Sequence, residues 1–383
     1  MSKTLEELRS EIDQIDQQMV DLFKARMEAA SQVAEYKKEK GLPVLDAGRE
    51  RALLNKVASQ AGEEFADYTQ SVYRTMLSAS RSYQNAKIGK SSHVYDGIRE
   101  ALKATPSLFP QRPTVACQGI EGAYSQIACD RLFKAPSIMF FQSFDHVFKA
   151  VESGLCQYGL LPIENSTAGS VKAVYDLMLS HNFSIVRSAR LKISHNLLAK
   201  HGTKLSDIKE IYSHEQAIDQ CAEYLGSLKG VTVKVVANTA MAARMVAESD
   251  RKDVAALSSR FCAEQYGLDT IESDVQDQDN NYTRFICISK KPEIYPGADH
   301  TTLMMTLPHK PGSLYNVLAK FYALNINLNK LESRPLPGRE FEFMFYFDIE
   351  ASVYAPEVEI LFRDLESECE QMRYLGTYNE VIC

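Results

Sequence analysis

The sequence contains no apolar run close to the roughly 20 residues that a membrane-spanning helix needs. Its first residues, MSKTLEELRSEI, lack the apolar core of a signal peptide. The net charge of −7 argues against a nucleic-acid or anionic-membrane surface, so an anionic ligand requires a local group of cations. We therefore expect a cytoplasmic protein with small-molecule sites and with neither nucleic-acid nor membrane partners.

Metal-binding and disulfide patterns are missing as well. The eight cysteines form no C-x-x-C pair or framework spacing, and the eight histidines form no H-x-x-x-H pair. We expect reduced thiols, no metal and no cofactor. With 383 residues, of which 45% are hydrophobic and 24% charged, the chain is long enough for two or three separate cores.

Proline and glycine are absent from residues 5–40, where apolar residues recur at alternating spacings of three and four. This pattern predicts a helix on the order of 50 Å long. Arg26 occupies a position that the pattern assigns to an apolar residue, and Lys37 lies within about 20° of it around the helix. Because an arginine in a buried row normally needs an anion, we favour a ligand site over a solvated position.

Two further helices are predicted before residue 88. Asp46 is a plausible N-cap for the first, which carries Arg49 and Glu50 in its first turn. Taken alone, those two residues would be a surface ion pair. The second, about residues 62–86, carries Ser80 and Gln84 four apart on one side. Its apolar stripe is too long for its companions to cover, which predicts a dimer.

Residues 1–88 resemble the all-helical chorismate mutase domain at eight positions: Arg9, Arg26, Lys37, Asp46, Arg49, Glu50, Ser80 and Gln84. The resemblance implies a pericyclic rearrangement of chorismate to prephenate, in which binding in the right shape is the catalysis. It implies that Arg26, and Arg9 of the partner subunit, bind the two carboxylates. Lys37 and Gln84 would donate to the ether oxygen, and Asp46 and Glu50 would orient the hydroxyl side. Arg49 and Ser80 would complete the carboxylate shell.

Residues 89–112 mix polar, glycine and proline residues around one short helical stretch and are predicted to be a linker. From residue 113, short apolar strands run into polar turns and helices, which predicts parallel α/β layers with the turns gathered at strand ends. These turns contain Tyr124, Ser125, Glu164, Asn165, Ser166, Ser213, His214, Gln216, Thr239 and Ser258. Taken singly, each Ser, Thr or Asn is more readily a helix cap than a ligand, and His214 a capping or packing residue.

The motifs GAYS, PIENSTAGSV, YSHEQA and NYTRF, in this order, resemble the catalytic domain of prephenate dehydratase over residues 113–290, with Tyr282 where the family usually has Phe. The resemblance implies a two-lobed α/β fold like that of periplasmic binding proteins. Prephenate must lose CO2 and its ring hydroxide together, and hydroxide leaves poorly without a donor. By resemblance Thr283 is that donor and Arg284 binds a substrate carboxylate. The prephenate site then also includes Tyr124, Ser125, Glu164, Asn165, Ser166, His214, Gln216 and Thr239.

Residues 297–383 predict the order strand, helix, strand, strand, helix, strand, a ferredoxin-like βαββαβ unit. They resemble the ACT regulatory domain, whose ESRP motif is matched by Glu332, Ser333, Arg334 and Pro335. Its Gly-Ala-Leu-Val motif is replaced by Gly312, Ser313, Leu314 and Tyr315. The resemblance implies that L-phenylalanine binds between two such domains and inhibits by feedback. Without it, a structural or dimerisation unit is about equally favoured.

The three resemblances together predict a multidomain α and α/β enzyme of phenylalanine biosynthesis, a homodimer or larger, that converts chorismate to prephenate and then to phenylpyruvate. Arogenate dehydratase activity in the second domain is a close alternative, because the residue types do not separate the two substrates. A non-catalytic amino-acid sensor or solute-binding protein is another alternative. The missing signal peptide and the mutase residues argue against it.

Overall fold

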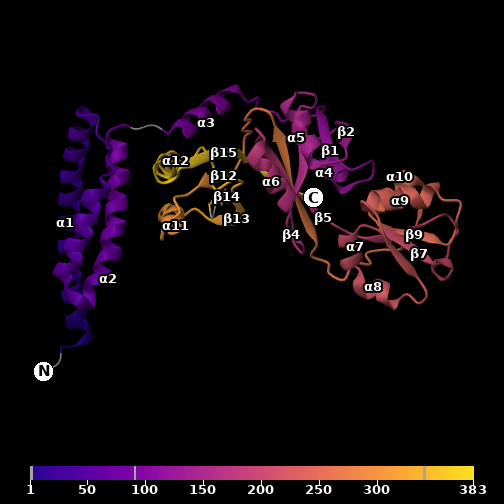
Figure 1. Ribbon diagram of the computed structural model, residues 1–383, viewed down its shortest axis with the longest axis horizontal. Coiled ribbons are helices and arrows are strands. Elements are labelled where there is room, and N and C mark those ends of the chain that lie inside the picture. Colours follow the sequence, from indigo (N-terminus) through magenta and orange to yellow (C-terminus); the bar gives the residue numbers. More distant parts are fainter. Residues whose placement is uncertain (1–2, 90–91, 340–341) are drawn as a thin grey trace.

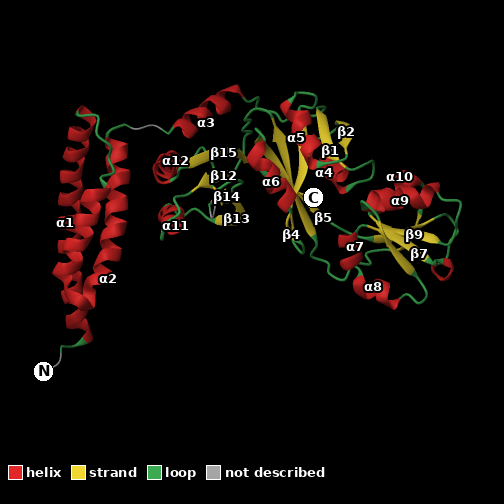
Figure 2. Cartoon of the chain, viewed as in Figure 1, coloured by secondary structure: helices red, strands yellow, loops and turns green. Residues whose placement is uncertain are grey.

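The computed structural model of the chain describes residues 3–89, 92–339 and 342–383. Residues 1–2, 90–91 and 340–341, which belong to the predicted first domain, linker and C-terminal domain, lie outside this description. Three bodies follow one another along the long axis: a helical module, a four-stranded C-terminal unit and a two-lobed α/β body (Figure 1). Figure 2 shows that the helical module has no strands in its described part.

The helical module consists of α1 (Leu5–Glu39) and α2 (Ala47–Lys87). Thr4 and Glu7 form a capping box at the start of α1. Gly62 interrupts α2 with φ 76° and ψ 168°. A straight helix would place Glu50 and Arg81 about 46 Å apart, yet their side chains are hydrogen-bonded at 2.7 Å. The chain therefore folds back at Gly62, as the two separately predicted helices require.

One face of α1 is left uncovered by the described part of the chain. Leu5, Ile12 and Leu22 are 62%, 56% and 71% exposed. The buried apolar residues of the module come mainly from the contact between α1 and α2 and are Ala34, Leu54, Val57 and Leu77. A helix that crosses a membrane must be both long and apolar. Helices α1 and α2 are too polar, and none of the other helices in the described part of the chain is long and apolar enough.

The first lobe of the two-lobed body is a seven-stranded sheet in the order β16-β5-β11-β3-β1-β2, with β4 beside β3. Its strands are β1 (Thr114–Gln118), β2 (Ser137–Phe141), β3 (Tyr158–Asn165), β4 (Gly169–Ser170), β5 (Ser184–Lys192), β11 (Tyr282–Ser289) and β16 (Glu380–Ile382), and its helices are α4 (Tyr124–Leu132), α5 (Phe144–Glu152) and α6 (Lys172–Ser180). Strand β1 is parallel to β2 and β3, as predicted, but β11 is antiparallel to β3 and β5. The difference arises because the chain enters β11 on its return from the second lobe.

The second lobe is a five-stranded sheet in the order β10-β6-β9-β7-β8. Its strands are β6 (Asn196–Ala199), β7 (Glu210–Ser213), β8 (Thr232–Val235), β9 (Val254–Ser258) and β10 (Asp269–Glu272), and its helices are η1 (Leu205–Asp207), α7 (Glu215–Asp219), α8 (Ala222–Ser227), α9 (Thr239–Glu248) and α10 (Arg260–Tyr266). The two segments that connect the lobes are hydrogen-bonded to each other. Ile193 N donates to Asn281 O at 2.8 Å, and Val275 N donates to His195 O at 2.9 Å. The lobes are thus joined by a pair of adjacent crossings, which confirms the predicted two-lobed architecture.

The C-terminal unit has a four-stranded sheet in the order β13-β14-β12-β15. Its elements are β12 (His300–Thr306), α11 (Ser313–Ala323), β13 (Leu328–Pro335), β14 (Phe343–Glu350), α12 (Pro356–Glu368) and β15 (Gln371–Tyr378). This order confirms the predicted ferredoxin-like unit. Helices α11 and α12 cover one face of the sheet (Figure 1), with Leu303, Phe347 and Phe362 fully buried between the layers.

The other face of this sheet packs on the first lobe. Tyr346 and Tyr378 belong to the same buried cluster as Met178 and Ile185 of that lobe. Strand β15 approaches β5 so closely that a Cβ on Gly376 would lie 2.0 Å from the carbonyl oxygen of Ile185. The unit and the first lobe therefore share one hydrophobic core.

Two segments tie the bodies together in ways that the sequence did not predict. The predicted linker contains α3 (His93–Ala104), whose Ile98 and Ala101 are buried in the core of the C-terminal unit. After β15, the chain continues into β16, which pairs in parallel with β5. The C-terminus consequently lies against the first lobe (Figure 1).

Candidate functional site

The fold-back of α2 brings its first turn next to its last turns, where Ser80 and Gln84 lie. Gln84 Nε2 donates to Ser80 Oγ at 3.2 Å, and both side chains are buried. Gln84 Oε1 is also buried and has no hydrogen-bond partner within the described residues. An unpaired buried polar atom is costly unless a ligand or water satisfies it. This corner of the module therefore has the properties of a binding site.

Other residues expected at this site lie on α1 and in the turn that follows. Arg26 is half-buried, and its Nη1 is enclosed without a partner in the part of the chain that is described. Lys37 Nζ donates to Val44 O at 2.5 Å. Asp46 accepts from Arg49 N at 3.0 Å, which confirms it as the N-cap of α2, and the Arg49 side chain is exposed.

Arg9 is not brought to this corner. It is exposed on α1, and 17 residues of helix separate it from Arg26 by about 26 Å. Both residues lie on one continuous helix, so no bend of α1 closes this distance. An Arg9 that acts on the same ligand as Arg26 must belong to another copy of the chain.

Sequence reasoning missed Arg81, which contacts Glu50 directly. Arg81 Nη1 donates to both carboxylate oxygens of Glu50 at 2.7 Å, and Nη2 donates to Glu368 Oε1 of α12 at 3.3 Å. Its position between Ser80 and Gln84 was the available signal. The residue pattern of one helix does not reveal that Glu50 and Glu368, which lie far away in the sequence, face Arg81.

In the two-lobed body, Asn165 forms the centre of a polar group that includes Thr283. Asn165 Nδ2 donates to Thr283 Oγ1 at 3.0 Å and to Asn281 Oδ1 at 2.7 Å. The backbone N–H groups of Thr167 and Ala168 donate to Asn165 Oδ1 at 3.1 and 2.9 Å, which fixes the orientation of the amide. We call Asn165, Thr167, Gln220, Asn281 and Thr283 the Thr283 cluster.

The Thr283 cluster bridges the two lobes through Gln220, which follows α7 of the second lobe. Asn281 Nδ2 donates to Gln220 Oε1 at 2.9 Å, and Gln220 Nε2 donates to Thr167 Oγ1 at 2.8 Å. His195 Nε2 lies 3.0 Å from Gln220 Oε1. Burial lowers the pKa of His195, although the Gln220 contact opposes this, so the imidazole is neutral at pH 7. Gln220, Asn281 and His195 were not predicted, because polar residues of this kind are common in loops.

The other residues expected to bind prephenate have local partners. Tyr124 Oη donates to Ser194 O at 2.6 Å, and burial raises the Tyr124 pKa. His214 caps α7 by accepting a hydrogen bond from Gln216 N at 3.3 Å, in agreement with the capping role that the sequence predicts for it when it is considered alone. The remaining set is held as follows: Ser125 Oγ donates to Gln118 O, Ser166 Oγ donates to Asn280 O, Glu164 accepts from Lys330 Nζ, Ser213 Oγ donates to Leu257 O, Thr239 opens α9 after its cap Asn238, and Ser258 is buried.

Arg284 faces away from Thr283, because successive side chains of a strand point to opposite faces. It is paired with Asp348, and its Nε lies 2.9 Å from Glu380 Oε1. Burial alone would lower the Arg284 pKa, but Tyr378, Asp348 and Glu380 raise it overall, so the guanidinium stays charged. Its donors face two carboxylates of the C-terminal segment. The expectation that Arg284 binds a substrate carboxylate stays a prediction.

The ESRP motif is divided between the two faces of β13. Glu332 accepts from Ser170 Oγ at 2.6 Å, and Arg334 donates to both Asp176 oxygens at 2.7 and 2.8 Å. Ser333 and Pro335 are exposed on the other face. Glu332 and Arg334 thus bind the first lobe of their own chain, and the effector role expected of the four residues stays a prediction.

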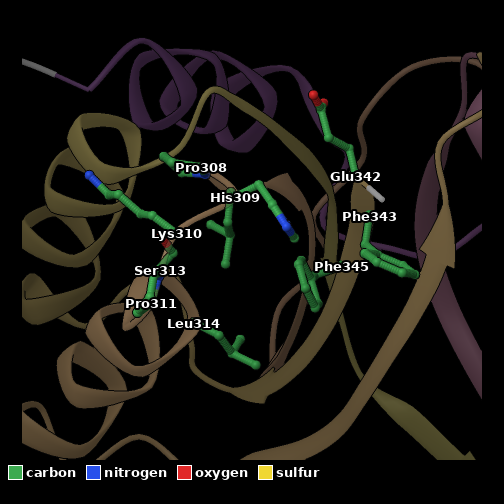
Figure 3. Close-up of a pocket in the computed structure, with 10 residues that line it drawn as sticks. Pro308, His309, Lys310, Pro311, Ser313, Leu314, Glu342, Phe343 and Phe345 are labelled. Carbon is green, nitrogen blue, oxygen red and sulfur yellow. The ribbon is translucent and has the colours of Figure 1, made fainter. Parts of the chain in front are cut away.

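An open hollow of about 350 Å³ lies beside the start of α11. It is lined by Leu307, Pro308, His309, Lys310, Pro311, Ser313, Leu314, Glu342, Phe343 and Phe345. Figure 3 shows His309, Leu314 and Phe345 pointing into the hollow. Gly312 precedes α11 with φ 85°, a conformation that favours glycine, and a Cβ there would meet no atom within 4 Å. Two expected effector residues, Ser313 and Leu314, are thus brought to one hollow.

Comparison with known proteins matches two parts of the chain to family models. Residues 8–85 match chorismate mutase type II, and residues 115–293 match prephenate dehydratase. The bifunctional chorismate mutase/prephenate dehydratase of Escherichia coli K12 is 30% identical over 381 residues, which cover 97% of this chain and 95% of that protein. Arogenate dehydratase/prephenate dehydratase 2 of Arabidopsis thaliana is 39% identical over 279 residues, which cover 70% of this chain and 73% of that protein.

Among solved structures, the prephenate dehydratase of Arthrobacter aurescens in complex with L-Phe is similar with a TM-score of 0.64. It is 29% identical and covers 70% of this chain and 89% of that chain.

Proposed function

This chain belongs to the family of bifunctional chorismate mutase/prephenate dehydratases, and from this premise we propose which residues carry each reaction. It rearranges chorismate to prephenate, and it removes CO2 and water from prephenate to give phenylpyruvate. For the parts of the chain we propose a mutase domain at 1–88, a linker at 89–112, a dehydratase domain at 113–290 and a regulatory domain at 297–383. The family-model ranges support the first and third of these boundaries.

The mutase site that we propose is the corner where the first turn of α2, with Glu50, lies beside its last turns, with Ser80 and Gln84. The contact of Glu50 with Arg81 next to the Ser80–Gln84 pair, produced by the fold-back at Gly62, is the observation that carries the assignment. The rearrangement needs no nucleophile, so the residues act by holding chorismate in a reactive shape and by stabilising charge on the ether oxygen. Rotation of the Gln84 amide lets Ser80 donate to Oε1 and leaves Nε2 free for that oxygen, together with Lys37. The enclosed Nη1 of Arg26 supports its role toward a carboxylate.

We propose that the mutase domain is a dimer and that Arg9 of the partner subunit completes each site. The exposed apolar face of α1 and the roughly 26 Å between Arg9 and Arg26 support this arrangement. Mixing two inactive variants, Arg9→Ala and Arg26→Ala, after joint refolding tests it. A mixed dimer contains one intact site, so mutase activity should return to about a quarter of the unmodified value. No recovery, despite mixed dimers, would mean that one chain supplies both arginines.

For the dehydratase reaction we propose Thr283 as the donor to the departing hydroxide. Asn165 donates to Thr283 Oγ1, so the threonine hydroxyl hydrogen is free to point toward a substrate. Thr283 has an ordinary weak acidity and therefore stabilises the developing charge as a hydrogen-bond donor in an enclosed site. Tyr124, Ser125, Glu164, Ser166, His214, Gln216 and Thr239 remain proposed contributors from the polar turns. The cross-lobe contacts of Gln220 support a site that closes between the lobes.

Separate loss of the two activities tests both assignments together. Arg26→Ala should abolish chorismate turnover and leave prephenate turnover nearly unchanged, and Thr283→Ala should do the reverse. The two sites are built from different residues on different cores, which is the physical reason for this independence. If either substitution removed both activities from a folded protein, a shared site would replace the two that are proposed.

The preferred substrate of the second reaction is proposed to be prephenate. The mutase on the same chain produces prephenate, whereas arogenate would require a separate transamination. The Arabidopsis relative carries both activities in its name, so arogenate is the alternative. Feeding the protein prephenate and arogenate separately, and measuring phenylpyruvate and phenylalanine, distinguishes them by the ratio of kcat/KM.

We propose that L-phenylalanine binds the hollow beside α11 and inhibits by feedback. Leu314, Phe343 and Phe345 offer an apolar surface for an aromatic ring, and the α11 N-terminus favours a carboxylate. Gly312→Ala should weaken inhibition several-fold, through the strained backbone at φ 85° rather than through a clash. Calorimetric titration of phenylalanine into the full chain, with and without the substitution, is the measurement. Unchanged affinity would remove the hollow as the effector site.

The remaining proposals concern the cellular location of the protein and its need for metals or cofactors. We propose a cytoplasmic location, supported by eight cysteines that are all unpaired within the described chain, as expected for a reducing compartment. That neither reaction uses a metal or a cofactor stays a prediction. Assays after exhaustive treatment with a chelator test it, since full activity is expected to remain.

A further inference from the structure

Arg81 joins a carboxylate of the mutase domain to a carboxylate of the regulatory domain. Its Nη1 binds Glu50 at 2.7 Å, and its Nη2 binds Glu368 Oε1 at 3.3 Å. The side chains of Arg81, Glu50 and Glu368 are 19%, 22% and 19% exposed, so all three are largely shielded from water. Burial alone would lower the Arg81 pKa, but Glu50 and Glu368 raise it overall, and the guanidinium stays charged.

Glu368 is held on its own side by the regulatory domain. Lys320 Nζ lies 3.9 Å from both Glu368 Oε1 and Asp364 Oδ2. Lys320 belongs to α11, the helix whose first residues line the hollow in Figure 3. A continuous row of charged contacts therefore runs from α11 through Glu368 and Arg81 to Glu50.

The contact between Arg81 and Glu368 is supported by α3, which follows α2 closely in the chain. Val94 N donates to Glu366 Oε1 of α12 at 2.9 Å, and Tyr95 Oη donates to Val353 O at 3.3 Å. Ile98 of α3 is 1% exposed in the core of the regulatory domain. The C-terminal end of α2 is thus kept beside α12 independently of the ion pairs.

A glutamate that orients a substrate hydroxyl must itself have a fixed orientation. A free glutamate side chain samples several rotamers, and ordering it costs conformational entropy. Arg81 restrains Glu50 through both carboxylate oxygens, and Glu368 in turn restrains Arg81. In a reaction that depends on the shape of the bound substrate, this order contributes directly to rate.

We propose that Arg81 is a positioning residue for the rearrangement of chorismate and that Glu368 holds it in place, so that the regulatory domain helps to organise the mutase site. The proposal rests on the mutase function proposed above and on the role of Glu50 in it. Arg81 acts through Glu50 and does not contact the reacting atoms.

The test is Glu368→Gln in the full-length protein. This residue lies in the regulatory domain and belongs to neither proposed active site. We expect kcat/KM for chorismate to fall about fivefold, because the Arg81 contact with residue 368 keeps an oxygen acceptor but loses the negative charge that strengthens it. Turnover of prephenate by the same preparation should be unchanged, which also shows that the protein is folded. The matched control is Glu359→Gln, which makes the same chemical change on α12 at a residue that pairs with Arg99 of α3.

A double-mutant cycle separates positioning from simple domain attachment. Arg81→Lys keeps a cation beside Glu50, but a single ammonium lacks the planar fork that joins two carboxylates. Arg81→Lys should therefore retain more mutase activity than Arg81→Met, and adding Glu368→Gln to Arg81→Lys should have no further effect.

Two outcomes overturn the proposal. Either Glu368→Gln leaves chorismate turnover unchanged, or Glu359→Gln lowers it equally. Failure of the mutase function itself is distinguishable, because the unmodified protein would then not consume chorismate.

Discussion

Replacing Arg284 by methionine should destabilise the joint core of the first lobe and the C-terminal unit. The substitution keeps much of the side-chain volume but removes the cation between Asp348 and Glu380, whose side chains are 8% and 7% exposed. Removing one partner of a buried ion pair costs about 3–5 kcal/mol, since the remaining charge is left without compensation. Glu380 keeps Arg190 as a second partner, so most of this cost falls on Asp348. Urea unfolding followed by circular dichroism measures the loss.

The matched control is Arg244→Met. Arg244 pairs with Glu248 one helical turn away, at side-chain exposures of 47% and 64%, where such a solvent-screened pair contributes little to stability. Adding Asp348→Leu to Arg284→Met should recover part of the lost stability, because an apolar residue there needs no ionic partner. Equal losses for Arg284→Met and Arg244→Met would refute the stabilising role of the buried pairing between Arg284 and Asp348.

Three further predictions address the sites and the second lobe. Gln84→Glu should make mutase activity fall as pH rises through the carboxyl pKa, because only the protonated acid donates, and a flat pH profile would remove Gln84 from its role. Asn165→Asp should lower dehydratase kcat at least tenfold, because a carboxylate accepts the Thr283 hydroxyl hydrogen that the substrate needs, and unchanged kcat would contradict this geometry. Lys234 and Arg251 lower the Glu210 pKa from 4.5 to about 2. The stability that ionised Glu210 adds is therefore complete above pH 4.5 and is lost as the pH falls toward 2. The melting temperatures of the unmodified protein and of Glu210→Gln should differ by a constant amount above pH 4.5 and converge below it.

Much of the fold was predictable because its signals are local. The spacing of apolar residues in 5–40 defines α1, and the order of strands and helices after 297 defines the C-terminal unit. The docking of α3 and the addition of β16 to the first lobe were not predictable. Both depend on complementary surfaces far apart in sequence, such as Ile98 against the C-terminal core, which no periodicity reports.

The candidate sites were predictable to the extent that the motifs themselves supply the side chains. Ser80, Gln84 and Thr283 lie among polar partners, as their motifs imply. Arg284 shows the limit of this reasoning, because adjacency in sequence on a strand places it on the opposite face from Thr283. Asn281 and Gln220 come into contact only because the chain returns from the second lobe to the first. Arg81 comes near Glu50 only because α2 folds back at Gly62.

The same geometrical relation occurs at both sites. Ser80 is followed by Arg81 and Thr283 by Arg284, and in each pair the first residue faces the proposed site while the arginine binds a carboxylate of the C-terminal segment, which Arg81 does in addition to binding Glu50. Neighbouring side chains differ in direction by about 100° on a helix and point to opposite faces of a strand. One residue can therefore serve a site while the next is bound to the C-terminal unit. The contacts of Asp348 with Arg284 and of Glu368 with Arg81 therefore reach the backbone one residue from Thr283 and one residue from Ser80 without occupying either site.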